Sequence, residues 1–94
     1  MEKFEEMVEN DPKLKREFLL NQQRYELAEV LREIRIAKGY SQADVAKIAG
    51  LTQQMISKIE TYNGNPSFDS FWSYCNAIGV NLLTLIKDKY KGEI

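Results

Sequence analysis

Two short helical segments joined by a tight turn, residues 41–60, constrain the fold of this chain more than any other stretch. Their sequence is SQADVAKIAGLTQQMISKIE. Ser41 can cap the first segment, and Asp44 three residues later can complete a capping box. Gly50 can supply the left-handed conformation that ends a helix, and Thr52 can cap the helix that follows. The pattern therefore predicts a helix-turn-helix.

The second helix of this motif has an apolar and a polar side. Ile56 and Ile59 anchor it inward, while Leu51 fills the angle between the two helices. The outward residues carry amides, a hydroxyl and an ammonium group: Gln53, Gln54, Ser57 and Lys58. A helix-turn-helix with such a face is suited to the major groove of DNA.

The segment before the motif is also predicted to be helical. Asp11 and Pro12 form a typical helix start, and Gly39 closes the helix. Residues 12–38 contain neither glycine nor proline, so they form either one long helix or two with a bend near residues 21–23.

At about 100° per residue, the apolar side chains of this segment fall on two stripes. One stripe comprises Leu14, Phe18, Tyr25 and Ala28. The other comprises Leu20, Leu27, Leu31 and Ile34. One stripe is expected to join the DNA-binding core. The other needs a separate surface, on this chain, on a second copy or on a different protein.

Three more helices are expected from apolar spacing and caps. Ser67 caps one whose apolar face comprises Phe68, Phe71, Tyr74, Cys75 and Ile78. Asn81 is a good cap for a last helix with three inward residues, Leu82, Leu85 and Ile86. Residues 80–86 could instead form a short strand, but the cap favours a helix. Residues 1–10 suggest an acidic amphipathic helix with Phe4, Met7 and Val8 on one face.

Composition argues against several classes of function. The chain of 94 residues has no histidine, so a general base near neutral pH would need a strongly shifted carboxylate or lysine. Zinc would have only Cys75 and scattered carboxylates as ligands. We therefore expect no enzyme, no metal site and no cofactor.

The single cysteine allows no internal disulfide, which fits a reducing compartment. No apolar run approaches the ~20 residues of a membrane span, and the acidic N-terminus lacks the apolar core of a signal peptide. A cytoplasmic protein without a membrane partner is expected.

The net charge of −1 is unusual for a nucleic-acid binder. The acidic balance is concentrated in the first eleven residues, which contain five carboxylates and one lysine. The remaining DNA-facing unit is close to neutral. Non-specific affinity should therefore be modest, and specific binding should depend on dimer symmetry and base contacts.

The motif resembles the helix-turn-helix of the lambda/434 repressor and Cro class, also called the xenobiotic-response-element class. The similarity runs without gaps from about Leu31 to Leu85. It includes Gly39-Tyr40-Ser41-Gln42, Gly50-Leu51-Thr52, Ile56-Ser57-x-Ile59-Glu60, Asn65-Pro66-Ser67 and Ala77-Ile78-Gly79-Val80. It implies an all-α fold, a five-helix Cro/C1-type helix-turn-helix bundle with an N-terminal helical extension. We place the extension at residues 1–23 and the DNA-binding domain at residues 24–94.

The resemblance also implies roles for individual residues. Glutamine can bond adenine through two atoms, and the expected base contacts are Gln53, Gln54, Ser57 and Lys58. The expected phosphate contacts are Gln42, Thr52, Lys38, Lys47 and Asn63. Arg35 and Glu60 should form a structural ion pair. Tyr62 departs from the family pattern, which has glycine there followed by cations, so the helix exit should place Asn63 or Gly64 in the left-handed conformation.

The N-terminal segment narrows the resemblance further. Asn10-Asp11-Pro12, Phe18 and Tyr25-Glu26-Leu27-Ala28 are similar to the helical lead of HigA-type antitoxins. That implies a partner, a small basic RelE/HigB-like ribonuclease toxin, which an acidic segment with a spare apolar stripe would suit. The toxin-binding candidates are Phe4, Met7, Val8, Leu14, Phe18 and Tyr25.

The expected function is thus the antitoxin of a type II toxin–antitoxin pair. As a homodimer it would bind a palindromic operator in double-stranded DNA and repress its own operon. One alternative is a phage- or plasmid-type repressor without a toxin partner. Another is a helical protein-interaction adaptor that does not bind DNA.

Overall fold

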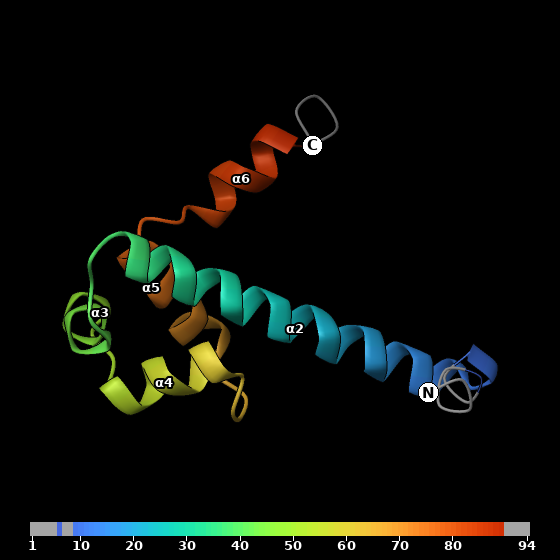
Figure 1. Cartoon of the computed structure of the whole chain (residues 1–94). Coiled ribbons are helices and arrows are strands. Elements are labelled where there is room, and N and C mark those ends of the chain that lie inside the picture. Colours follow the sequence, from blue (N-terminus) through green and yellow to red (C-terminus); the bar gives the residue numbers. More distant parts are fainter. Residues whose placement is uncertain (1–5, 7–8, 90–94) are drawn as a thin grey trace.

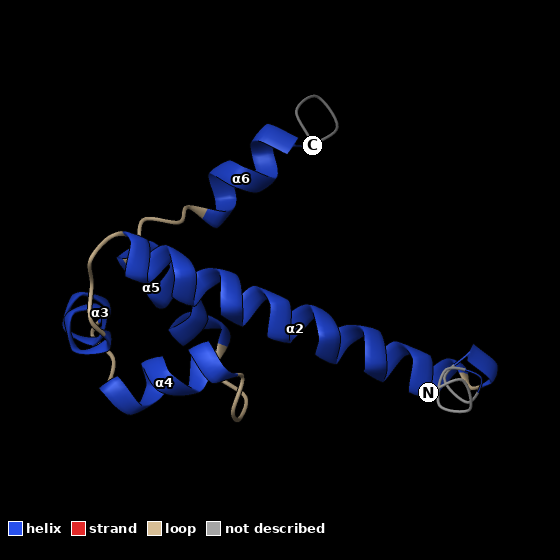
Figure 2. Ribbon diagram, in the orientation of Figure 1, coloured by secondary structure: helices blue, strands red, loops and turns tan. Residues whose placement is uncertain are grey.

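The computed structural model describes residue 6 and residues 9–89, and this part of the chain contains helices but no strand (Figures 1 and 2). The helices are α2 (Pro12–Ala37), α3 (Gln42–Ala49), α4 (Gln53–Thr61), α5 (Phe68–Ala77) and α6 (Leu82–Lys89). The all-α, five-helix prediction is confirmed. Three residues assigned to the acidic N-terminal helix, Phe4, Met7 and Val8, lie outside the described residues. None of the described helices is long and apolar enough to cross a membrane.

Helix α2 is one continuous helix of 26 residues, without the bend considered near residues 21–23. Asp11 caps it as predicted, because its Oδ1 accepts from the backbone N–H of Lys13 at 2.9 Å and of Leu14 at 3.3 Å. The helix ends at Ala37 with Lys38 as its C-cap, and the following Gly39 has a φ of 79°, in the left-handed region.

Only the second half of α2 packs against the other helices, and the first half projects away from them (Figure 1). Ala28 and Leu31 are both buried, whereas Leu20 and Leu27 are exposed. The division of α2 into two stripes is therefore wrong in part, since Ala28 lies in the bundle with Leu31. Position along the helix decides burial as much as direction does, because the partner helices contact only its second half.

The core gathers side chains from α2, α3, α4 and α5. Its buried members are Leu31, Val45, Ala46, Ile56, Ile59, Tyr74, Cys75 and Ile78. Leu51 and Met55 pack against them from partly buried positions. The inward orientation predicted for Ile56 and Ile59 is confirmed.

The turn between α3 and α4 forms as the sequence predicts. Ser41 and Asp44 make both hydrogen bonds of the capping box. Gly50 has a φ of 71°, and the Thr52 hydroxyl accepts from the Met55 backbone N–H at 3.1 Å. Local hydrogen bonding therefore fixes where α4 begins.

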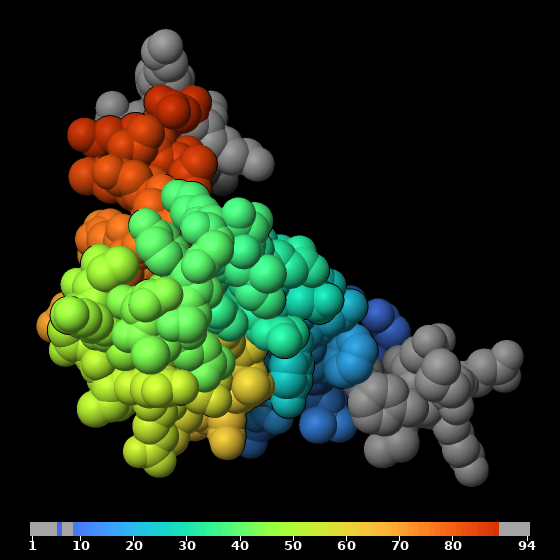
Figure 3. Space-filling model, turned by 60° about the vertical axis from the view of Figure 1, so that its left-hand side comes forward, coloured from blue at the N-terminus to red at the C-terminus, as the bar shows by residue number. Residues whose placement is uncertain are grey.

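The last part of the chain differs from expectation in its burial. Residues 82–89 form a helix, with the Asn81 side chain accepting from the Thr84 backbone N–H at 2.9 Å. Leu85 and Ile86 are nevertheless 58% and 50% exposed, because α6 extends away from the bundle (Figure 3). Phe68, predicted to face inward, is 71% exposed at the first turn of α5.

Candidate nucleic-acid interface

The outer side of α4 presents the polar side chains singled out as base contacts. Gln53, Gln54 and Lys58 are exposed, and Ser57 is half-buried. The two glutamines occupy the first turn, directly after the cap residue Thr52. The arrangement therefore offers amide donors and acceptors at the helix N-terminus and a cation one turn further along.

The five phosphate candidates do not all lie together. Lys47 on α3 and Asn63 after α4 are exposed. Lys38 instead lies against the turn between α5 and α6, where its ammonium nitrogen occupies the space that a Cβ on Gly79 would need. Gln42 is half-buried at the start of α3, and its amide nitrogen donates to Glu60 Oε1 at 3.2 Å. The Gln42 side chain is thus hydrogen-bonded within the bundle. At the start of α3, the backbone N–H groups are the remaining candidates for a phosphate contact.

A buried ion pair links α2 to α4. Arg35 Nε lies 2.6 Å from Glu60 Oε2, and Arg35 Nη2 lies 3.0 Å from Glu60 Oε1. The Tyr74 hydroxyl on α5 donates to Glu60 Oε2 at 2.5 Å, and Arg35 Nη1 donates to the Tyr40 carbonyl at 2.7 Å. Glu60 therefore connects side chains from four helices and fixes the direction in which α4 leaves the bundle.

The electrostatics of this cluster keep Glu60 charged. Burial alone raises the pKa of Glu60, but hydrogen bonds from Arg35, Tyr74 and Gln42 outweigh it and hold the pKa below the usual 4.5. The hydrogen bond to Glu60 raises the pKa of Arg35. Burial, together with the bond to Glu60, raises the pKa of Tyr74. Glu60 and Arg35 are thus ionised, and Tyr74 is a neutral donor, at neutral pH.

Acid should weaken the fold through Glu60. Because its pKa is lowered in the folded state, the stabilisation from Glu60 is fully present above the unfolded value near 4.5 and is lost as pH falls through the folded value. We expect the urea midpoint to fall more steeply with acidification below about pH 5 in the wild type than in Glu60→Gln. Asp69→Asn removes an exposed carboxylate that is not part of this cluster and serves as the control. Equal acid dependence in wild type and Glu60→Gln would contradict the assignment.

The end of α4 differs from the sequence prediction. Tyr62 itself adopts the left-handed conformation, with φ 53° and ψ 45°, and its backbone N–H bonds to the Lys58 carbonyl. Gly64 also has a positive φ, but it comes after the helix has ended. The assignment of the helix exit to Asn63 or Gly64 is therefore wrong.

The physical reason is a set of contacts from α2. The ring of Tyr25 meets the ring of Tyr62 edge-to-face at 5.5 Å between centroids. The guanidinium carbon of Arg24 lies 5.2 Å from the centroid of Tyr62, and Arg24 also donates to the Tyr62 hydroxyl. A non-glycine left-handed residue persists where its surroundings hold it, and these contacts do so. Sequence reasoning missed Arg24, because 38 positions separate it from Tyr62 and no local pattern connects them.

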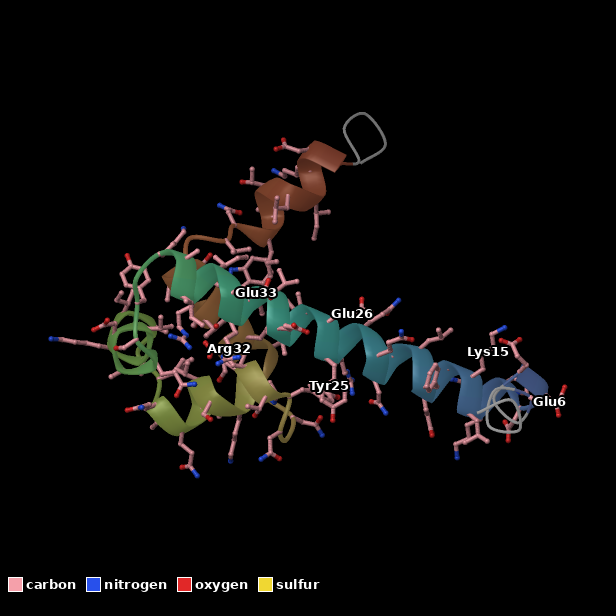
Figure 4. The ribbon with its side chains drawn as sticks, in the orientation of Figure 1. Glu6, Lys15, Tyr25, Glu26, Arg32 and Glu33 are labelled. Carbon is pink, nitrogen blue, oxygen red and sulfur yellow. The ribbon has the colours of Figure 1, made fainter. Side chains whose placement is uncertain are left out.

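A shallow groove runs along the projecting part of α2. It has a volume of about 410 Å³ and is lined by Phe18, Asn21, Gln22, Tyr25, Glu26 and Glu29. Leu14, another toxin-binding candidate, is exposed one turn before Phe18. In Figure 4, Tyr25 lies on the side of α2 toward the end of α4, whereas Glu26 and Glu33 lie on the other side. The groove thus combines apolar rings with carboxylates.

Within the described residues, no three side chains of the histidine, cysteine, aspartate and glutamate type are grouped to hold a metal ion. Cys75 is buried, and burial raises the pKa of its thiol to about 11. Its sulfur is therefore a packed apolar group at neutral pH.

The chain matches a known protein family. A family model described as helix-turn-helix matches residues 31–85, which is more than half of the chain. The matched region begins in the buried half of α2 and ends within α6. No curated protein matches the chain.

Proposed function

Because the chain belongs to the helix-turn-helix family, we propose that it is a transcriptional regulator that binds double-stranded DNA through α3 and α4. The observation that carries this function is the exposed first turn of α4, with Gln53 and Gln54 beside the cap Thr52. The first residues of a recognition helix are the ones that reach base edges in the major groove. The start of α3 and Lys47 are the proposed phosphate contacts beside it.

The first experiment is a gel shift at low salt. The wild-type chain is used to select duplexes from a randomised pool, and the enriched duplex is then compared with a scrambled one. We expect preferential retention of the enriched duplex, with affinity falling as salt is raised. Failure to retain any duplex at low salt contradicts the regulator assignment. The alternative function is then a helical protein-interaction adaptor that does not bind DNA.

The finer proposal is that the protein is an antitoxin whose α2 holds a small basic ribonuclease toxin. Support comes from the groove on α2, whose lining begins at Phe18 in the projecting half of the helix and ends at Glu29 beside the bundle. Tyr25 is 61% exposed, and it lines this groove together with Glu26 and Glu29. An apolar ring flanked by negative charges complements a basic protein surface.

The proposal also includes a homodimer that places one copy of α4 in each half-site of a palindromic operator. Helix α6 supports this part. Three large apolar side chains on it, Leu83, Leu85 and Ile86, are each at least half exposed. Exposed apolar clusters on small proteins mark contact surfaces, and a second copy is the occupant that a two-fold operator requires.

Charge reversal on the groove tests the toxin interaction. We expect Glu26→Lys/Glu29→Lys to weaken binding of the basic product encoded beside this gene at least tenfold, because the two carboxylates become repulsive. Glu17→Lys/Glu33→Lys is the matched control, since it reverses two exposed charges on the same helix at residues that do not line the groove. Binding is measured by calorimetry, and relief of translation inhibition in a cell-free extract measures neutralisation. If Glu26→Lys/Glu29→Lys binds as tightly as the control, the groove is not the toxin site. If no neighbouring product binds the wild type, the antitoxin proposal is refuted and the alternative is a repressor without a toxin partner.

A further inference from the structure

Arg24 is an exposed cation that the fold brings to the end of α4 from outside the matched helix-turn-helix region. Its guanidinium bonds to the hydroxyl of Tyr62, and its carbon atom Cζ lies over the ring of that residue. Both contacts are made to the same residue, Tyr62. No carboxylate pairs with Arg24 in the part of the chain that the structure describes. Its positive charge is therefore available to an external anion.

The place where this charge lies is poor in other cations. The loop from residue 62 to residue 67 contains no lysine or arginine. Lys58 is the last cation on α4, and its side-chain carbon Cδ lies 4.0 Å from the position that a Cβ on Gly64 would occupy. Arg24 thus adds a second positive charge where the loop itself supplies none.

The direction in which Arg24 lies follows from helical spacing. Gln54 and Lys58 are four residues apart and lie on one side of α4, and Tyr62 ends the helix four residues after Lys58. Eight residues span about 12 Å along a helix, which is about the width of the major groove. If Gln54 reaches base edges, the end of this row lies near the groove wall, where the phosphates are. Arg24 is held at that end.

We propose that Arg24 is a phosphate-binding residue of the DNA interface, positioned by Tyr62, so that the interface extends from the helix-turn-helix onto α2. This inference rests on the proposed DNA-binding function. The inference also gives the left-handed Tyr62 a role, because the residue that ends α4 is the one whose ring and hydroxyl hold the Arg24 guanidinium. Because Tyr25 touches the same ring and lines the groove on α2, Arg24 lies between the two proposed binding surfaces.

The test measures how the affinity for the enriched duplex depends on salt. For Arg24→Gln we expect the slope of log affinity against log salt to become shallower by about 1, the change for one lost phosphate contact. Affinity should fall by a similar factor on enriched and scrambled duplexes, because a phosphate contact carries no sequence information. Arg24→Lys should keep the wild-type slope, since it retains the charge.

Arg16→Gln is the matched control, an exposed arginine on the same helix two turns before Arg24. Circular dichroism melting establishes that every variant is folded. An unchanged slope in Arg24→Gln, or an equal change in Arg16→Gln, overturns the inference while wild-type binding still stands. Loss that is confined to the enriched duplex overturns it too, because Arg24 would then read a base. Failure of the wild type to bind any duplex is distinct and refutes the proposed function itself.

Discussion

Replacing Glu60 with alanine is expected to lower the free energy of unfolding by about 3–5 kcal/mol, the usual effect of removing one partner of a buried ion pair. The change leaves the Arg35 guanidinium buried with only the Tyr40 carbonyl as a partner. It also removes the acceptor of the Tyr74 hydroxyl, which is fully buried. A small domain has roughly 5–15 kcal/mol of stability in total, so this variant should be partly unfolded at room temperature or melt far below the wild type. Urea unfolding followed by circular dichroism measures the difference.

The control replaces the whole cluster with apolar side chains of similar size, as in Arg35→Met/Glu60→Leu/Tyr74→Phe. Removing every charged and hydroxyl group together avoids an unpaired buried charge, and such replacements are often close to neutral. We therefore expect the triple variant to be more stable than Glu60→Ala. A loss in unfolding free energy below about 1 kcal/mol for Glu60→Ala would contradict this expectation, because the pair would then contribute no more than an exposed surface ion pair. DNA binding by the triple variant reports separately whether the ion pair sets the direction of α4.

The second large effect is expected at the first turn of α4. Glutamine that bonds a base edge through two atoms contributes about 1–3 kcal/mol of discrimination, which is roughly 5- to 150-fold in affinity. Gln53→Ala and Gln54→Ala should each reduce the preference for the enriched duplex over a scrambled one. The double variant should lose most of that preference. It should keep the salt dependence of binding, because phosphate contacts and not base contacts produce that dependence.

The matched control is Gln22→Ala, which removes a glutamine that lines the groove on α2 and is not part of α4. Fluorescence anisotropy with both duplexes over a series of salt concentrations separates sequence preference from total affinity. Unchanged preference in the double variant would show that neither glutamine reads a base. A preference that disappears together with the salt dependence would instead indicate that α4 is displaced or unfolded.

The helix limits around the turn could be predicted because their causes are local. A cap acts within three or four residues, as when Ser41 accepts from Asp44 or Thr52 accepts from Met55. Glycine at position 50 has the left-handed freedom that the turn needs. The same reasoning placed the cap of α2 at Asp11 and the end of the helix before Gly39.

Burial could be predicted only where spacing and tertiary contact agree. Ile56 and Ile59 face inward because three helices meet α4 on that side. Leu85 and Ile86 have the spacing of an inward face, yet α6 leaves the bundle and exposes them. Apolar spacing gives the face of a helix, whereas the neighbours that cover this face depend on how the helices pack.

The sequence by itself determined the helix-turn-helix, its caps and the polar residues on the outer side of α4, because these features depend on neighbours within about one helical turn. Only the tertiary structure decided that Tyr62 ends α4 in the left-handed conformation and that Arg24 lies upon it. That contact depends on the direction of α2 relative to α4, which the buried Arg35 and Glu60 pair helps to fix. A contact across 38 residues follows from the packing of two helices, and neither local spacing nor composition encodes it directly.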